Sequence, residues 1–227
     1  MTKYVYTFLI VFCCCTQIEA QKQFPFQNEQ LDLETRLNDL VSRMTLEEKI
    51  SQLMSDAPAI ERLNIPKYNW WNESLHGVAR AGYATVFPQS ISIAASWDAQ
   101  LVREVATAIS DEARAKHHEY LRRDQHDIYQ GLTMWSPNIN IFRDPRWGRG
   151  HETYGEDPFL TGTLGAQYVK GLQGDDPEYL KVVATAEHFA VHSGPEESRH
   201  YFDANTMERD LWETYLPAFR MLVKDAQ

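Results

Sequence analysis

One stretch of the chain, residues 138–158, holds a dense set of side chains that could bind a polar ligand. It contains three arginines, several acidic residues, a tryptophan and a tyrosine, and glycine and proline interrupt it too often for a regular helix or strand. At its end, Asp157 and Pro158 have the form of a helix N-cap followed by proline at the first helical position. Long loops of this make-up on a rigid scaffold often carry binding residues. The alternative is a charged surface loop with internal ion pairs, and composition alone does not decide between the two.

A second cluster, residues 68–80, combines flat apolar faces with hydrogen-bonding groups. Trp70 and Trp71 are adjacent, and Asn72, Glu73 and His76 follow them. Aromatic faces pack on the C–H faces of sugars while carboxylates and amides bind hydroxyl groups, so the cluster fits a sugar ligand. The same residues also fit a buried aromatic cluster with polar neighbours, which is the commoner use of paired tryptophans.

Other chemistries find less support. The neighbours His117 and His118 would point about 100° apart on a helix and do not easily face one metal ion. No Gly-x-Gly-x-x-Gly follows a predicted strand, which counts against nucleotide binding. The formal net charge is −10, which counts against nucleic acid and anionic membranes as partners. We therefore expect no cofactor and no metal.

The first 20 residues have the pattern of a secretory signal peptide, with Lys3, an apolar run too short to span a bilayer, and Ala20 at a plausible cleavage point. Removing them would remove all three cysteines and leave no thiol nucleophile and no membrane attachment. A lipoprotein anchor at Cys13–Cys15 is the alternative, although the bulky Phe12 disfavours it. The sequence thus predicts a secreted or periplasmic protein with a flexible lead-in at residues 21–30.

Apolar periodicity, capping residues and proline predict the elements of the remaining chain. In order they are helix 33–44, helix 45–54, strand 87–95, helix 99–122, strand 133–141, helix 159–172, strand 182–189, loop 194–204 and a helix capped by Thr206 and kinked at Pro217. In helix 99–122, which Asp98 should cap, residues Leu101, Val102, Val105 and Ile109 should face inward. Short apolar strands alternating with helices predict an α/β fold with a buried parallel sheet, and the polar clusters follow the strands. Periodicity does not choose between a βα-barrel and an open doubly wound sheet.

Seven short motifs, in this order and spacing, resemble the N-terminal barrel domain of glycoside hydrolase family 3, the β-glucosidase and β-xylosidase family. They lie at residues 44–50 (MTLEEKI), 71–77 (WNESLHG), 87–88 (FP), 136–140 (SPNIN), 146–149 (RWGR), 155–158 (GEDP) and 188–190 (HFA). The resemblance implies that residues 31–227 form the N-terminal portion of a TIM-like (β/α)8 barrel. It also implies that the substrate is a β-linked oligosaccharide or glycoside.

The same resemblance implies roles for individual residues. Glu73 matches the acidic residue that binds the far hydroxyls of the terminal sugar, and Arg149 matches the arginine that binds ring hydroxyls. His188 matches the histidine of the family's Lys-His pair, and Arg199 matches an arginine near the nucleophile. Trp135 lies where the family often has an aromatic residue lining the subsite.

Two departures from the family pattern stand out. Glu187 occupies the position of the family's lysine, and we expect its side chain in the sugar pocket. There it would lower activity at least about 100-fold relative to lysine, unless it pairs with Arg149 or Arg199. In addition, the family's nucleophile and acid/base residue would lie beyond Gln227, so the resemblance implies a truncated chain that holds the substrate-binding half and is inactive alone.

Three hypotheses about function remain open. The chain could belong to an exo-acting retaining β-glycosidase, it could be a carbohydrate-binding remnant without catalysis, or it could be a different barrel enzyme with Glu152 and Glu156 as its carboxylate pair. Glu73 is one methylene longer than the aspartate common in the family's glucosidases. It would crowd the hydroxymethyl group of glucose, so we expect β-xylosides to be preferred over β-glucosides.

Overall fold

The computed structural model describes residues 24–226, which fall into two compact units that divide between Thr45 and Leu46. The predicted signal peptide and the first residues of the lead-in lie outside the described part of the chain. The first unit holds a 3₁₀ turn, η1 (Pro25–Gln27), and helix α1 (Leu33–Arg43), which confirms the predicted first helix. Asp32 caps α1 by accepting a 2.9 Å hydrogen bond from the Thr35 backbone N–H. Phe26 is tied to α1 through its N–H, which donates to Asp39 Oδ2 at 3.1 Å.

The second unit begins with helix α2 (Leu46–Ser51), which ends earlier than the predicted 45–54. Two short antiparallel strands follow, β1 (Asp56–Ala57) and β2 (Tyr68–Asn69), with the 3₁₀ turn η2 (Glu61–Leu63) between them. This hairpin leads directly into the Trp70–Trp71 cluster.

Three chain segments then run parallel to one another, side by side in chain order. Strand β3 (Thr133–Met134) pairs with β4 (Val183–Ala184), and an isolated parallel bridge joins Asn72 to Met134. A further parallel bridge joins Asn138 to Glu187. The predicted strands 133–141 and 182–189 are therefore present, but their regular pairing is short and continues as single bridges.

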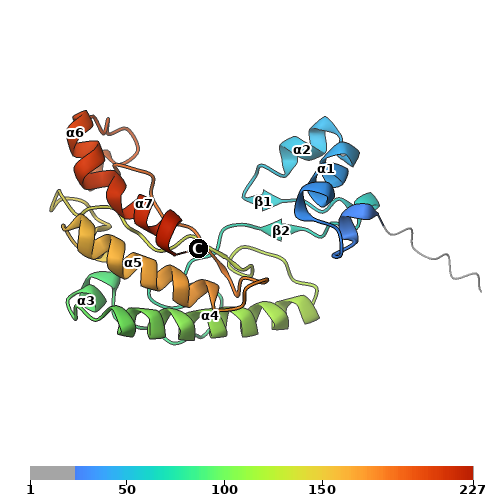
Figure 1. Cartoon of the computed structure of the whole chain (residues 1–227), viewed down its shortest axis with the longest axis horizontal. Coiled ribbons are helices and arrows are strands. Elements are labelled where there is room, and N and C mark those ends of the chain that lie inside the picture. The colour runs from blue at the N-terminus through green and yellow to red at the C-terminus, as the bar shows by residue number, and fades with distance from the viewer. Residues whose placement is uncertain (1–23, 227) are drawn as a thin grey trace, which may run out of the picture. The chain divides into compact units, whose positions relative to one another are not determined.

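Helices connect these segments. Helix α3 (Ser90–Ala94) and helix α4 (Ala99–Arg122) lie between the first and second segments, and helix α5 (Pro158–Gln173) lies between the second and third. The chain continues through η4 (Glu196–Ser198) into α6 (Glu208–Asp210), a π-helical turn η5 (Leu211–Tyr215) and α7 (Leu216–Asp225). Helix α5 packs against both α4 and α7 (Figure 1). The predicted alternation of helix and strand is thus the observed order from α4 onward.

The core lies between these three helices and the parallel segments. Its largest fully buried side chains include Ile109 of α4, Leu164, Tyr168 and Leu172 of α5, and Val182. Helix α5 approaches α4 closely at Gly171, where an added Cβ would lie 2.5 Å from the Arg103 carbonyl oxygen. Both predicted caps are confirmed, because Asp98 accepts from Gln100 and Leu101 N–H and Asp157 accepts from Leu160 N–H.

Residues 87–95 do not form the predicted strand. Residues 90–94 are helix α3, and the buried positions Ser90, Ile93 and Ala94 follow the helical spacing i, i+3, i+4. The Ser-Ile-Ser-Ile alternation resembles a strand, but the run is too short for periodicity to separate the two structures. In α4, Val102, Val105 and Ile109 are buried as expected, whereas Leu101 is exposed.

The C-terminal helix also begins differently from the prediction. Met207, not Thr206, is the N-cap of α6, and it makes no side-chain cap bond. The expected irregularity near Pro217 takes the form of the π-helical turn just before it. Proline has no N–H to donate to the preceding turn, which favours such a local change in hydrogen bonding.

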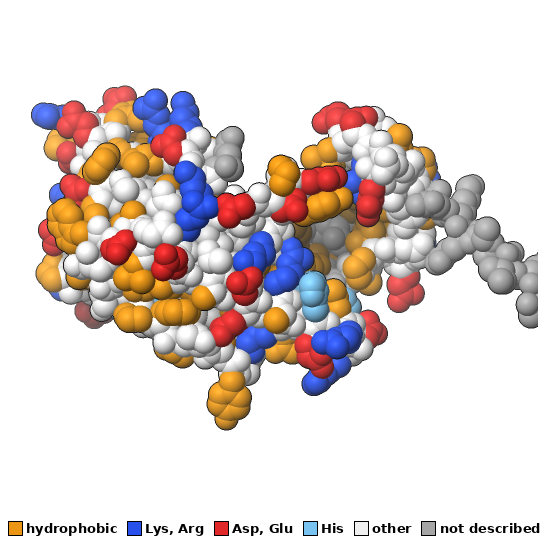
Figure 2. All heavy atoms as spheres, turned by 60° about the horizontal axis from the view of Figure 1, so that its bottom comes forward, with side chains coloured by type: hydrophobic (Ala, Val, Ile, Leu, Met, Phe, Trp, Pro, Cys, Tyr) orange, Lys and Arg blue, Asp and Glu red, His pale blue; other side chains and the backbone are white. Residues whose placement is uncertain are grey.

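On the face of the molecule shown in Figure 2, acidic and basic side chains are intermixed. No helix in the described part of the chain is both long and apolar enough to cross a bilayer.

Candidate functional site

A polar cavity of about 500 Å³ lies among the loops that follow the parallel segments. Three of the six residues predicted for the site line it, namely Glu73, Arg149 and Arg199. They come from three segments far apart in the sequence. The other lining residues are Arg80, Glu152, His192 and His200. The carboxyl ends of parallel strands are where α/β proteins place their sites.

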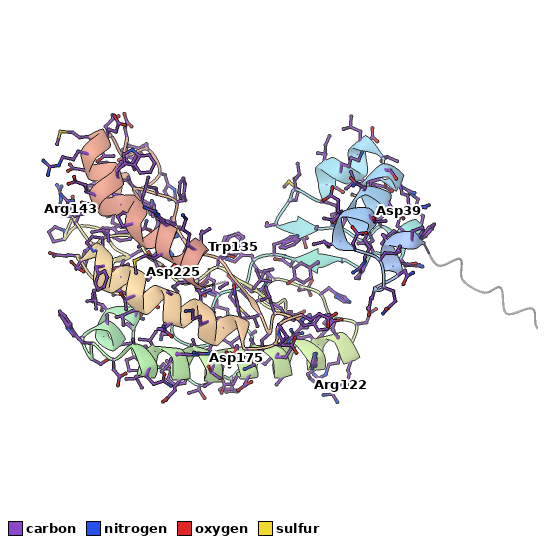
Figure 3. All side chains as sticks on the ribbon, in the orientation of Figure 1. Asp39, Arg122, Trp135, Arg143, Asp175 and Asp225 are labelled. Carbon is purple, nitrogen blue, oxygen red and sulfur yellow. The ribbon has the colours of Figure 1, made fainter. Side chains whose placement is uncertain are left out.

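Glu73 is held by the aromatic cluster. The Trp71 indole N–H donates to Glu73 Oε1 at 2.9 Å. The Trp71 ring stacks on the Trp135 ring, with centroids 4.9 Å apart and planes 18° apart. Trp135, labelled in Figure 3, directly follows β3, and its N–H donates to the Asn72 carbonyl oxygen at 2.7 Å. Trp135 therefore does not line the cavity itself but supports the tryptophan that orients Glu73.

The loop over residues 138–158 is an ordered structure in which most polar groups have partners. Phe142 N–H donates to the Gly155 carbonyl oxygen at 3.0 Å, and Gly155 adopts a φ of 116°, which glycine tolerates far better than other residues. Arg143, labelled in Figure 3, lies over the Tyr215 ring at 5.7 Å and so ties the loop to the C-terminal helix. These contacts fix the loop that presents Arg149.

Arg149 is the centre of a charged cluster, which also contains Glu152, Glu187 and His188. Its Nε lies 2.9 Å from both carboxylate oxygens of Glu152, and its NH2 lies 2.6 Å from Glu152 Oε2. The same NH2 is 3.1 Å from Glu187 Oε1, and NH1 is 2.6 Å from His188 Nε2. One guanidinium thus serves two carboxylates and one imidazole.

The electrostatics of this cluster follow from its burial and its pairing. Burial alone would raise the pKa of Glu152, but the hydrogen bonds and charge of Arg149 outweigh burial and lower it. Burial alone would lower the pKa of Arg149, and its two carboxylate partners outweigh burial and raise it. Both groups therefore stay ionised at neutral pH, and Glu152 is a poor candidate for a proton donor.

His188 is oriented by Asn140. Asn140 Oδ1 accepts from the His188 backbone N–H and lies 2.9 Å from His188 Nδ1. Asn140 Oδ1 is only an acceptor, so Nδ1 carries the proton, and Nε2 is then free to accept from Arg149. Glu187 is fixed through its backbone, because its N–H donates to Pro137 O at 3.0 Å and its carbonyl accepts from Ile139 N–H at 2.8 Å.

Arg199 lies on the opposite loop and pairs with Glu196, with NH1 2.8 Å from Glu196 Oε1. Glu196 in turn accepts from the Gly148 N–H at 3.1 Å, so the two loops are joined. An added Cβ on Gly148 would lie 2.7 Å from the Glu196 side chain, so the two loops approach closely at this point. His192 also lines the cavity, with its ring centroid 4.7 Å from that of His188. Burial first, and then the neighbouring His188, Arg149 and Arg199, lower the pKa of His192.

The structure separates the predicted residues into two groups. Glu73, Arg149 and Arg199 line the cavity, whereas Trp135, Glu187 and His188 do not line it and act on residues that do. We expected the Glu187 side chain to lie in the pocket. Instead it forms an ion pair with Arg149, which is the alternative that the sequence left open. Glu156 is exposed and does not line the cavity with Glu152.

Sequence reasoning missed four residues of the site. Trp71 belonged to a motif that was recognised, but only the structure shows its bond to Glu73. Arg80 ends the same motif and has a left-handed φ of 63°, which is uncommon for a residue other than glycine. His192 and His200 carry no local signal that could have marked them. Within residues 24–226, no three His, Cys, Asp or Glu side chains are grouped so as to hold a metal ion.

These features define a parallel α/β protein with a polar site at the carboxyl ends of its strands. Residues 33–227 match the family model described as the glycosyl hydrolase family 3 N terminal domain, and the chain belongs to this family. The sequence-based assignment to the N-terminal portion of a TIM-barrel-like α/β fold is thereby confirmed.

Named relatives are glycosidases. A xylan 1,4-β-xylosidase from Xylanibacter ruminicola is 48% identical over 98% of this chain and 26% of its own length. A solved structure of a family 3 exo-β-xylosidase (XlnD), in complex with a xylobiose aziridine activity-based probe, is 36% identical with a TM-score of 0.79. It is matched over 89% of this chain and 27% of its own. The Bifidobacterium adolescentis family 3 β-glucosidase structure is 30% identical with a TM-score of 0.67, over 82% of this chain and 26% of its own. The chain therefore spans about a quarter of the length of these relatives.

Proposed function

We propose that this chain supplies the sugar-binding part of an exo-acting, retaining β-glycosidase that prefers β-xylosides. The observation that carries the proposal is the convergence of Glu73, Arg149 and Arg199 on one polar cavity. Charged donors and acceptors bind the hydroxyl groups of a neutral sugar through charge-assisted hydrogen bonds, which are shorter and stronger than neutral ones. Bonds to hydroxyls near the reacting carbon strengthen further in the oxocarbenium-like transition state.

The preference for xylosides rests on Glu73. Its side chain reaches one methylene further than aspartate, and the Trp71 indole fixes its Oε1 at 2.9 Å, so the carboxylate has little freedom to withdraw. A glucose hydroxymethyl group would have to share the space that the longer side chain takes, whereas xylose has no such group. Pockets usually discriminate one such group by a factor of about 10 to 200.

The two catalytic carboxylates come, in this proposal, from the part of the relatives' length that the chain does not span. A retaining glycosidase needs two carboxyl groups about 5–5.5 Å apart. Of the carboxylates lining the cavity, Glu152 is engaged by Arg149 and Glu73 by Trp71. The engagement of Glu152 also favours the second candidate function, carbohydrate binding without catalysis, over a Glu152–Glu156 catalytic pair.

The proposal is tested with a chimaera in which this chain replaces the matching 26% of the Xylanibacter ruminicola relative. We expect the chimaera to hydrolyse nitrophenyl β-D-xyloside with a higher kcat/KM than nitrophenyl β-D-glucoside. The unaltered relative serves as the positive control. Xylobiose binding without hydrolysis would support the second candidate function. The absence of both binding and hydrolysis in a folded chimaera would refute both candidate functions. A glucoside preference of about tenfold, or 1.4 kcal/mol, would refute the xyloside assignment alone.

We also propose that the protein is exported, with residues 1–20 as the signal peptide. Intact-mass measurement of the protein purified from a whole culture of its host, cells and medium together, tests this proposal. A chain beginning near Gln21 is expected, while a lipid-modified cysteine at the N-terminus would favour the lipoprotein alternative and a retained Met1 would refute export through this segment.

A further inference from the structure

We infer that Glu187 limits the affinity of the cavity for sugars by occupying Arg149, so that residue 187 sets how many guanidinium donors a sugar can reach. The inference rests on the proposed function of this cavity and deepens it. It concerns a residue that does not line the cavity, and it assigns that residue a positioning role with a direct effect on substrate binding.

The hydrogen bonds of Arg149 show how few of its N–H donors remain available to a sugar. A guanidinium has five N–H donors. The Nε–H and one N–H of NH2 are directed to Glu152, the second N–H of NH2 is directed to Glu187 at 3.1 Å, and one N–H of NH1 is directed to His188. Four of the five donors thus have acceptors within the described protein.

The position of Glu187 favours its hydrogen bond with the NH2 group of Arg149. Its side chain is only 14% exposed, and its backbone is held at the parallel bridge to Asn138, so the carboxylate cannot move far from Arg149. Glu187 Oε2 also lies 3.1 Å from His188 Nε2, so the carboxylate contacts both Arg149 and His188. One N–H of the cavity-lining Arg149 is therefore already engaged within the protein.

A sugar hydroxyl would compete with this carboxylate for the same NH2 group. A hydrogen bond from a guanidinium to a carboxylate is stronger than one to a neutral hydroxyl, because both partners are charged. Glu187 should therefore win the competition. Lysine, the residue of the family motif, would leave that N–H of Arg149 without an internal acceptor and would add a cationic donor of its own.

The test measures the dissociation constant of methyl β-D-xylopyranoside for the full chain by ligand-observed NMR. We expect Glu187→Gln to bind several-fold more tightly than the unaltered chain, because the amide is a weaker acceptor, and Glu187→Lys to bind about tenfold more tightly. Asp111→Asn is the matched control. It removes one negative charge from the ion pair with Lys181 on the outer face of α4, so it should leave binding unchanged. An equal gain in this control would attribute the effect to net charge and overturn the inference.

A double-substitution cycle isolates the route through Arg149. In an Arg149→Gln background, changing Glu187 to Gln should have little further effect on xyloside binding. An undiminished gain in that background would show that Glu187 acts without Arg149. If the double variant fails to fold, the comparison of Glu187→Gln with Asp111→Asn decides alone. Measurable binding by the unaltered chain with the same affinity in Glu187→Gln refutes only the inference, whereas no binding by any folded variant refutes the proposed function with it.

Discussion

Arg149 and Glu73 line the same cavity, yet their surroundings differ. Arg149 is bound by two carboxylates and an imidazole in a half-buried cluster. Asn138 donates to Glu152, backbone hydrogen bonds hold Glu187, and Asn140 holds His188. Among the described residues, Glu73 has one side-chain hydrogen-bond partner, the Trp71 indole, and no ion-pair partner. The first arrangement holds the loop in place, and the second leaves a carboxylate free to accept hydroxyl groups. A charged side chain at a cavity wall is therefore not always a side chain available to a ligand.

The substitution Arg149→Met tests whether the Arg149 cluster stabilises the fold, and it should have the largest effect. It would leave Glu152 and Glu187 unpaired, with side chains only 15% and 14% exposed. Removing one partner of a largely buried ion pair costs about 3 kcal/mol, so the free energy of unfolding measured in urea should fall by about that amount. Arg146→Met is the control, because Arg146 is itself 72% exposed and pairs with a single carboxylate, Asp144, in the same loop. Similar losses in the two variants would contradict the structural role of the Arg149 cluster.

A second test addresses the Glu73 side. Glu73→Asp shortens the carboxylate by one methylene and opens the space for a hydroxymethyl group. In the chimaera, the ratio of kcat/KM for xyloside over glucoside should fall by about tenfold, with little change in unfolding free energy. Glu104→Asp, on the exposed face of α4, is the control and should not alter the ratio. An unchanged ratio in Glu73→Asp would remove Glu73 as the specificity determinant.

A weaker perturbation of the same side is Trp71→Phe. The ring can still stack on Trp135, but the N–H that orients Glu73 is lost. Because one neutral donor is removed, we expect the xyloside-over-glucoside ratio to fall only about threefold. Trp70→Phe is the matched control, since Trp70 contacts Tyr68 edge-on and is not bonded to Glu73. A larger effect from Trp70 than from Trp71 would show that the hydrogen bond is not what orients the carboxylate.

The sequence predicted those parts of the fold that depend on short-range interactions. Asp98 and Asp157 mark the starts of α4 and α5 by short-range chemistry, and both helices were predicted almost to the residue. Residues 90–94 were assigned wrongly, because four alternating residues fit strand and helix equally. Their helical state is decided by burial against the rest of the molecule.

In the site, Glu73 and Arg149 lie within recognised motifs, and the family resemblance pointed to Arg199 in the predicted loop over residues 194–204. The motifs could not show that Glu187 faces Arg149, since that contact joins residues 38 positions apart and depends on the parallel pairing of two segments. His192 and His200 were missed for the same reason. Their role follows from where the loop after β4 lies and not from any neighbouring residue type.

The smallest expected effect concerns pH and His192, which lies beside the Arg149 cluster. Burial and the nearby cations lower the pKa of His192 below its usual 6.5, so the folded protein holds it neutral where the unfolded chain binds a proton. Stability should therefore decrease as pH falls from about 7 through 6.5 toward the lowered pKa. His192→Gln removes this proton-linked difference, so the variant should lose less unfolding free energy between about pH 7 and pH 5 than the unaltered chain does. If the unfolding free energies of the two proteins changed equally with pH, the lowered pKa of His192 would be contradicted.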